Sequence, residues 1–445
     1  MFKNQSKKLF LFIFIALVVI LVMAGLGCKK TTPTPTPGPT PGPTPQPSAN
    51  LSFWGLWDDS SVFQPLIDEY RKINPNVTVT YKKWEYSEYE DMVTESLAAG
   101  RGPDIWMIHN TWLEKHKEKL SPMPDSLKVL PDFEKNFVDV VADDFVDKSE
   151  IYGVALSVDT LALYWNEDLL KSAHYTSPPQ NWEEFKEYTE KLTKFDEMGN
   201  IIQSGAALGC ARNVNRTADI LGLLMLQNGT QMINEERTQA TFNQEVTEQT
   251  GEGFNPGKEA LIFYTDFANP KKKVYTWNPT LSHSIDAFID EKVALMFSYS
   301  YHRPTIEARA PKLNYSIAPV PQIEGTPKEV NFANYWGIVV SNQSQAKEVA
   351  WDFLKFLSSK DMVAKYCEAT GRPASRYDVI EEQQQDPKLS VFANQTLTAK
   401  SWFRGKNLSQ TEGIIIDMIE KVVLGEQKAE EAIDWAAAQV TTLLQ

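Results

Sequence analysis

The feature that most restricts the fold is a regular alternation of strand and helix patterns that begins near residue 50. Short apolar runs at Leu51–Gly55, Val77–Tyr81 and Asp104–Ile108 alternate with segments of helical apolar spacing at Ser61–Ile73 and Tyr86–Ala99. Strands separated by helices of this length form parallel β-α-β units with helices on both faces of the sheet. The first third of the chain therefore predicts an α/β fold.

The same alternation returns further along the chain. Further strands are predicted at Leu161–Trp165, Ala294–Ser298, Tyr315–Pro319 and Gly337–Ser341, and helices at Trp182–Leu192, Ser344–Leu357, Ile414–Val423 and Glu430–Leu444. Asn181 precedes the first of these helices and is a typical N-cap residue. Because residues 51–445 are too many for one hydrophobic core, we expect two lobes.

The N-terminus has the pattern of an export signal. Lys3, Lys7 and Lys8 precede an uncharged apolar run, Leu9–Leu26, that ends at Gly27-Cys28. A cysteine at this place is typical of a bacterial lipoprotein, so we expect residues 1–27 to be a signal peptide and Cys28 to be lipidated. The run is also about long enough to span a bilayer, which leaves an uncleaved anchor open. Both alternatives put the rest of the chain outside the membrane, on its extracytoplasmic face.

A proline-rich segment joins this signal to the globular part. Proline occupies every second position from Pro33 to Pro47, which favours extended or polyproline conformations. We expect residues 28–50 to form a semi-rigid tether that reaches roughly 60–70 Å when fully extended.

The charge of the chain excludes one large class of partners. With 58 acidic and 44 basic residues, the formal net charge is −14. Nucleic-acid binding depends on lysine and arginine that neutralise phosphates, so we expect no nucleic-acid partner. The same balance argues against electrostatic docking on anionic lipid.

Aromatic and polar residues follow the predicted strands of the first α/β region. They are Trp57 and Asp58 after the first strand, Trp84 and Glu85 after the second, and Asn110 and Trp112 after the third. In open α/β sheets, ligands bind outside the carboxyl ends of the strands. We therefore expect a ligand site that includes Trp57, Asp58, Glu85, Asn110 and Trp112.

A series of short segments spread over the chain resembles one protein family. In chain order they are Phe53–Trp57, Ala99–Ile105, Tyr152–Val154, Leu163–Leu169, Val293–Met296, Trp336–Ser341, Ala350–Leu354 and Gly371–Pro373. By their order and spacing, residues 51–445 resemble the extracellular solute-binding proteins of ABC transporters, in the cluster that includes maltose-binding and other sugar-binding proteins.

The resemblance implies the type II periplasmic-binding-protein fold, with two α/β lobes joined by hinge crossings. Each lobe is then a mainly parallel sheet flanked by helices. Carried onto this chain, the N-terminal lobe would be residues 51–157 plus 336–371, and the C-terminal lobe 160–333 plus 375–445. Cys210 and Cys367 fall in different lobes, so we expect two free, buried thiols rather than a disulfide that would lock the hinge.

The resemblance also implies a function and further site residues. A sugar presents C–H faces to aromatic rings and hydroxyls to carboxylates, amides and arginine. Asp159 lies where the maltose-binding relatives present an acidic residue, Tyr299 and Tyr301 lie where many relatives have tryptophan, and Trp336 and Arg372 lie at crossings. We expect a monomer that captures a neutral mono- or oligosaccharide and delivers it to an ABC permease.

Enzyme hypotheses find little support in the sequence. The five histidines have no metal-binding spacing, and there is no Gly-x-Ser-x-Gly elbow, so we expect no catalytic residues, no metal site and no cofactor. The strongest rival is a lipid-anchored glycoside hydrolase with Asp58 and Asp159 as its carboxylate pair. A non-catalytic surface protein for carbohydrate binding or adhesion is a third hypothesis.

Overall fold

The computed structural model describes residues 48–247, 253–403 and 405–444. The predicted signal peptide 1–27, Cys28 and the proline-rich part of the tether lie outside these residues. In the described part of the chain, no helix is long and apolar enough to cross a membrane.

The N-terminal lobe is built on a five-stranded sheet in the order β2-β1-β3-β16-β6. Its strands are β1 (Ala49–Gly55), β2 (Val77–Lys83), β3 (Ile105–His109), β6 (Gly153–Ala155) and β16 (Trp336–Val340). Strand β1 runs parallel to β2 and β3, whereas β16 runs antiparallel to β3 and β6. The strand from far along the sequence is therefore inserted between two strands of the first third.

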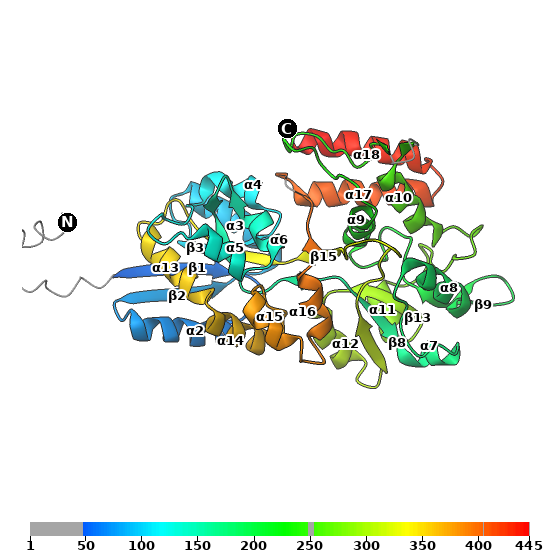
Figure 1. Cartoon of the computed structure of the whole chain (residues 1–445), viewed down its shortest axis with the longest axis horizontal. Coiled ribbons are helices and arrows are strands. Elements are labelled where there is room, and N and C mark those ends of the chain that lie inside the picture. The colour runs from blue at the N-terminus through cyan, green and yellow to red at the C-terminus, as the bar shows by residue number, and fades with distance from the viewer. Residues whose placement is uncertain (1–47, 248–252, 404, 445) are drawn as a thin grey trace, which may run out of the picture. The chain divides into compact units, whose positions relative to one another are not determined.

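Helices cover both faces of this sheet. They are α2 (Ser60–Ile73), α3 (Tyr86–Ala98), α4 (Leu113–His116), α5 (Leu130–Asn136), α6 (Asp139–Phe145), α13 (Lys347–Leu357), α14 (Lys360–Thr370) and α15 (Tyr377–Gln383), with the 3₁₀ turn η1 (Lys117–Lys119) and the small pair β4 (Val146–Asp147) and β5 (Glu150–Ile151). Helices α2 and α14 lie on one side of β1 and β2, and α3 lies on the other (Figure 1).

Alternating burial fixes the sides of these elements. In β1, Leu51 and Phe53 are buried, and α2 buries Phe63, Leu66 and Tyr70. In β16, a Cβ atom on Gly337 would lie 2.3 Å from the ring of Phe145, so glycine is required where that ring crosses the strand. The apolar side chains named here belong to one core cluster that fills the lobe.

The C-terminal lobe has a second five-stranded sheet, in the order β14-β8-β13-β10-β9. Its strands are β8 (Ala162–Asn166), β9 (Lys194–Phe195), β10 (Ile201–Ala206), β13 (Val293–Ser298) and β14 (Tyr315–Ala318). Only β10 and β13 pair in parallel; the other three pairs are antiparallel. The expectation of mainly parallel sheets is therefore corrected to mixed sheets, because β8 and β14 come from opposite ends of the lobe's sequence and meet on one edge.

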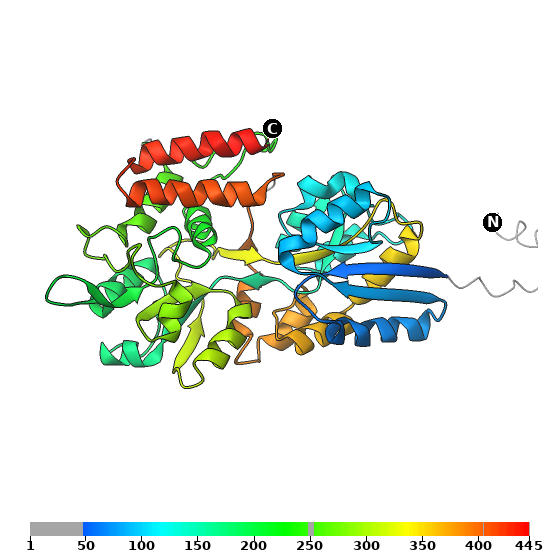
Figure 2. The same cartoon turned by 180° about the vertical axis from the view of Figure 1, so that it is seen from behind.

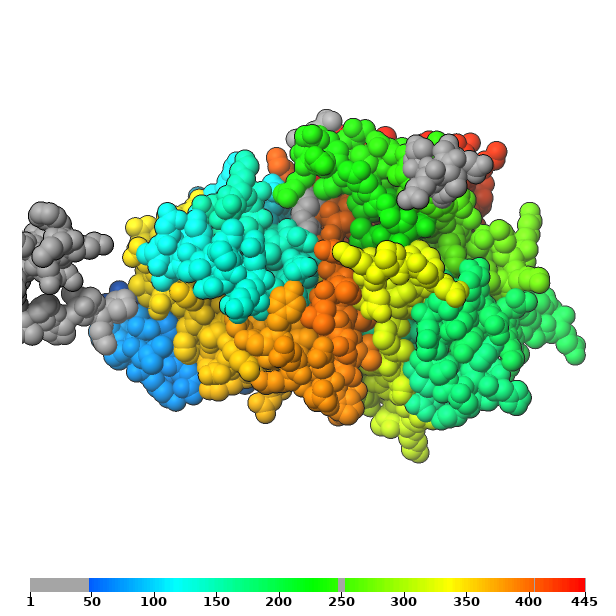
Figure 3. All heavy atoms as spheres, in the orientation of Figure 1, coloured from blue at the N-terminus to red at the C-terminus, as the bar shows by residue number. Residues whose placement is uncertain are grey.

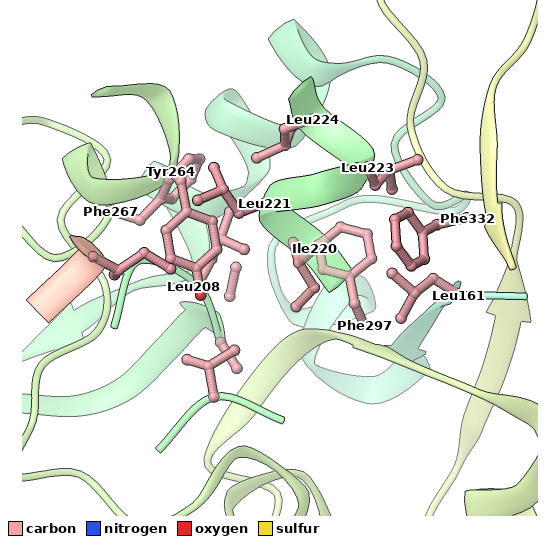
Figure 4. Close-up of a cluster of buried hydrophobic side chains, with 14 of the residues drawn as sticks. Leu161, Leu208, Ile220, Leu221, Leu223, Leu224, Tyr264, Phe267, Phe297 and Phe332 are labelled. Atoms are coloured by element: carbon pink, nitrogen blue, oxygen red, sulfur yellow. The ribbon is translucent and has the colours of Figure 1, made fainter. Parts of the chain in front are cut away.

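A large core cluster packs around helix α9 in this lobe. The helices and short elements are α7 (Glu167–Ser172), α8 (Trp182–Leu192), α9 (Thr217–Gln227), β11 (Val246–Thr247), β12 (Gly253–Phe254), α10 (Pro256–Asp266), α11 (Ser284–Ile289), η2 (Ser300–His302), α12 (Arg303–Arg309), α17 (Leu408–Val423) and α18 (Ala429–Leu444). Figure 4 shows Ile220, Leu221, Leu223 and Leu224 of α9 surrounded by apolar side chains. Helices α17 and α18 lie side by side over this lobe (Figure 2).

Three short strands form the crossing between the lobes. They are β7 (Asp159–Thr160), β15 (Asn331–Asn334) and β17 (Ala399–Lys400), in the order β17-β15-β7. Strand β7 joins β6 to β8, and β15 leads into β16, so each carries the chain from one sheet to the other. A third pass runs beside them, where the N–H of Val158 donates to the carbonyl of Pro373.

The segment after this third pass lies between the two lobes. Helix α16 (Ser390–Thr396) contributes Phe392 to the C-terminal core cluster and Ala393 to the N-terminal one. We expected residues 375–445 in the C-terminal lobe, but Val379 and Ile380 of α15 pack in the N-terminal core. In Figure 3 the segment that contains α15 and α16, coloured orange, lies between the surfaces of the two lobes. The other lobe limits stay a prediction.

The two described cysteines are free and buried, as expected. Cys210 belongs to the C-terminal core cluster and Cys367 to the N-terminal one.

Candidate functional site

Residues of both lobes line a cavity of about 470 Å³. Its lining consists of Trp57, Phe63, Tyr86, Met107, His109, Trp112, Leu156, Ser157, Asp159, Arg216, Tyr301, Asn334, Tyr335, Trp336, Ile338, Tyr366, Arg372, Leu408 and Glu412. Many of these residues end a strand or follow one within three residues, among them Trp57 after β1, His109 at the end of β3 and Tyr301 after β13. The cavity therefore lies where the chain passes from sheet to loop, as in other α/β proteins.

Aromatic rings from the N-terminal lobe form one wall of the cavity. Trp336 is at its centre, with its ring centroid 5.1 Å from that of Trp112 and 5.9 Å from that of Trp57, both edge to face. The ring of Tyr86 stacks on Trp57 at 5.2 Å and 26°. Trp336 lies opposite His109 in the β16–β3 register, which brings their rings to 5.4 Å. These rings offer apolar faces and edges to a ligand.

An aromatic ring faces the cavity from the C-terminal lobe as well. Tyr301 stacks on Tyr299, with ring centroids 5.6 Å apart and planes at 14°. Tyr299 itself is fully buried, and its hydroxyl donates to Asp219 at 2.6 Å. Tyr299 is thus the support on which the exposed ring of Tyr301 rests.

A buried carboxylate holds Arg372 at the cavity. The two terminal nitrogens of Arg372 each lie 2.9 Å from a different oxygen of Asp58. The hydroxyl of Tyr366 donates to Asp58 at 2.7 Å and accepts from Arg372 at 2.6 Å. Because a two-pronged pair fixes the plane of a guanidinium, Arg372 is a positioned donor rather than a free charge.

A second arginine is held in the same way from the C-terminal lobe. Arg216 donates to both oxygens of Asp219, at 2.7 and 2.9 Å, and lies 3.3 Å from Glu412. Burial raises the pKa of Glu412, and the charge of Arg216 opposes this shift. The backbone of Arg216 is in the left-handed region, with φ of 54°, where side chains other than glycine are uncommon.

Two further polar side chains lie deep in the cavity. Asp159 accepts hydrogen bonds from the hydroxyl and N–H of Ser300 and from the N–H of Thr160. Burial raises its pKa to about 6, against the lowering effect of these hydrogen bonds. Burial, and next the charge of Arg216, lower the pKa of His109 to about 4, so this ring is neutral at pH 7.

The profile of the bacterial extracellular solute-binding proteins matches residues 65–391. The chain belongs to this family. The resemblance inferred from the sequence is thereby confirmed, together with the expectation of a binding protein rather than an enzyme. The family is extracellular, in agreement with the expected extracytoplasmic location.

Relatives and solved structures agree with this assignment. A putative binding protein of Brucella abortus is 22% identical over 340 residues, which are 74% of this chain and 75% of the relative. The maltotriose-binding protein of Pyrococcus abyssi is 21% identical over 311 residues, 69% of this chain and 62% of the relative. The sugar-binding protein MalE of Xanthomonas citri is 20% identical, with a TM-score of 0.74 over 89% of this chain and 97% of that one. At this identity the match shows the fold and confirms the two-lobed α/β architecture.

The structure brings six of the ten predicted ligand residues to the cavity. They are Trp57, Trp112, Asp159, Tyr301, Trp336 and Arg372. The other four, Asp58, Glu85, Asn110 and Tyr299, lie outside its lining. Asp58 and Tyr299 act behind it through Arg372 and Tyr301, and the amide of Asn110 donates to Asp144. Binding by any of the ten stays a prediction.

Several cavity residues were missed in the sequence. Arg216 directly precedes helix α9 and Glu412 lies in α17, so neither follows a strand, and Tyr86 is the first residue of α3. Only Tyr86 had a local signal, since it follows the predicted second strand within three residues of Trp84. No described group of three or more histidine, cysteine or acidic side chains is arranged to hold a metal ion.

Proposed function

We propose that the chain captures a neutral carbohydrate in this cavity and delivers it to an ABC permease. The observation that carries the proposal is the combination of aromatic rings with arginines whose charges are already paired. Stacked and edge-on rings suit the C–H faces of sugars, and carboxylates, amides and guanidinium groups suit the hydroxyls.

The charge arrangement favours a neutral ligand over an anion. Of the described lining residues, both arginines are held by carboxylates, Arg372 by Asp58 and Arg216 by Asp219 and Glu412. The ring of His109 is neutral at pH 7 because burial lowers its pKa. A phosphate or carboxylate ligand would meet cations that are already neutralised, with the Asp159 carboxylate nearby. The similarity to the maltotriose-binding protein of Pyrococcus abyssi supports the same ligand class.

Capture in this proposal works by closure of the two lobes about β7 and β15. A ligand that touches both lobes stabilises the closed form by its higher affinity for that form. The closed protein then docks on the permease as a monomer. Cys28 carries the lipid anchor, and residues 28–50 tether the domain at the extracytoplasmic face.

The direct experiment is a thermal-shift screen of the purified protein against neutral sugars, uronic acids, sugar phosphates and amino acids. A specific ligand raises the melting temperature by mass action. We expect a higher melting temperature only with neutral sugars, and X-ray scattering should show that the protein becomes more compact when such a sugar binds. Shifts restricted to the anionic compounds would refute the proposal. The anchor has its own test: mass spectrometry of the mature N-terminus should find a diacylglycerol-modified Cys28.

A further inference from the structure

The aromatic wall of the cavity is buried at one end and open at the other. The side chain of Trp112 is 6% exposed, whereas Trp57 is 45% exposed and Tyr86 is 55% exposed. All three line the same cavity, and the half-buried Trp336 contacts each of them. The rings thus form a continuous path from the interior to the mouth.

The backbone holds Trp57 at the mouth in an unfavourable conformation. Its φ is 65°, in the left-handed region that bulky residues rarely adopt. Hydrogen bonds hold both backbone polar groups of the next residue, Asp58. Its N–H donates to the carbonyl of Leu56, and its carbonyl accepts from the hydroxyl of Tyr81. Strain that the surrounding structure enforces is typical of ligand sites.

The mouth has an exposed ring on its other side too. Tyr301 of the C-terminal lobe lines the cavity and is 45% exposed, and it rests on the buried ring of Tyr299. The mouth is therefore flanked by the Trp57–Tyr86 stack from one lobe and by Tyr301 from the other. Large aromatic side chains that both lobes leave open to water at one cavity indicate a binding surface rather than incomplete packing.

We propose that the ligand is an oligosaccharide, with its inner end beside Trp112 and its outer units lying against the Trp57–Tyr86 stack. This inference rests on the proposed function and specifies the ligand's length. A cavity of about 470 Å³ is in the lower half of the range for ligand pockets. A monosaccharide that bound beside Trp112 would leave the outer rings in water, whereas a longer chain would cover them.

The test compares affinities along two series of defined length. Isothermal titration calorimetry would use glucose, maltose, maltotriose and maltotetraose, and mannose, mannobiose and mannotriose. Two variants remove the outer rings: Tyr86→Ala, and Trp57→Gly, in which glycine suits the left-handed backbone. The matched control is Phe195→Ala, since Phe195 is 46% exposed and stacks on Tyr275 at 6.0 Å but lies outside the cavity lining.

We expect the wild-type affinity to rise with chain length in the series that binds. Tyr86→Ala and Trp57→Gly should weaken the longest ligand roughly threefold to tenfold, the range for one aromatic contact, and leave the shortest bound ligand unchanged. Phe195→Ala should change neither. A monosaccharide bound as tightly as the longest member, or equal losses at every length, would overturn the inference while the proposed function stands. Failure of both series to bind any form of the protein would overturn both.

Discussion

The pair of Asp58 and Arg372 allows a sharp test of how burial sets the strength of an ion pair. Asp58 is bound to Arg372 at 2.9 Å, with side chains 6% and 23% exposed. The next residue, Asp59, is bound to Lys83, also at 2.9 Å, but its side chain is 74% exposed and that of Lys83 is 34% exposed. The two carboxylates are neighbours in the sequence and lie at the same distance from their cations, but the Asp58 pair is buried and two-pronged whereas the Asp59 pair is exposed and single.

The expected loss in the free energy of unfolding differs severalfold between removal of the Asp58 carboxylate and removal of the Asp59 carboxylate. Breaking a fully buried pair by truncating one partner costs about 3–5 kcal/mol, because the remaining charge is left without a partner. Since Arg372 keeps some contact with water, we expect about 2–4 kcal/mol for Asp58→Ala. An exposed pair contributes about 0–1 kcal/mol, so Asp59→Ala should cost less than 1 kcal/mol. Asp59 makes no side-chain capping bond to α2 that would add to this figure.

Urea unfolding of the ligand-free protein, followed by tryptophan fluorescence, would measure both costs. The slope of the unfolding free energy against urea concentration should be the same in both variants as in the wild type, so that the shift in the urea midpoint reports the change in stability. The loss for Asp58→Ala should also be insensitive to salt, whereas that for Asp59→Ala should shrink at 1 M NaCl. Equal losses in the two variants would refute the reasoning that burial decides the strength of these pairs.

Three further predictions rest on other parts of the structure. Between pH 3.8 and about 6, folded Asp159 keeps a proton that the unfolded chain has lost, because burial raises its pKa. The stability of the wild type relative to Asp159→Asn should therefore fall as the pH rises through this window and level off above it, which urea titrations at several pH values would measure. A slope of the opposite sign would contradict the burial of this carboxyl group. Arg237 and Glu114 form an ion pair between the two lobes at 2.8 Å, and their side chains are 37% and 28% exposed. A double-mutant cycle with Arg237→Gln and Glu114→Gln should therefore give a coupling free energy below about 1 kcal/mol that vanishes in 1 M NaCl. A coupling free energy that does not depend on salt would contradict a solvated pair. Burial raises the pKa of the Cys210 and Cys367 thiols to about 12, so both should react with a thiol reagent only in urea, and rapid modification of the native protein would count against their burial.

Local patterns in the sequence predicted the elements that local chemistry decides, whereas α9, α10, α14 and β10 were not predicted. Helix α8 begins at Trp182 as predicted, since the side chain of Asn181 accepts the N–H of Glu184 and caps it. The alternation of Leu51 and Phe53 predicted the start of β1 to within two residues and its end at Gly55. Sheet order was not predictable in this way, because β16 pairs with β3 across more than two hundred residues and no local signal carries the direction of that pairing.

Six of the ten candidate residues line the cavity, but the direction in which each side chain points was not predictable from the sequence. Tyr299 and Tyr301 follow the same strand, yet one fills the interior and the other faces the cavity, because the hydroxyl of Tyr299 reaches the buried carboxylate of Asp219. Asp58 follows β1 as predicted but lies behind the cavity lining, where it binds Arg372 and Tyr366. A strand end selects the neighbourhood, and the buried charges nearby decide which side chains face the ligand.

The two arginine pairs explain why a site this rich in charge suits an uncharged ligand. Asp58 and Tyr366 together occupy three donors of Arg372, and Asp219 and Glu412 together occupy three donors of Arg216, so each arginine at the cavity keeps two N–H donors. A guanidinium held in this way donates hydrogen bonds along fixed directions and loses little side-chain entropy when ligand binds. Hydroxyl groups can use such donors, whereas an anion would have to compete with a carboxylate already in place. Because one pair lies in the N-terminal lobe and the other in the C-terminal lobe, a ligand that bonds to both arginines also holds the lobes together.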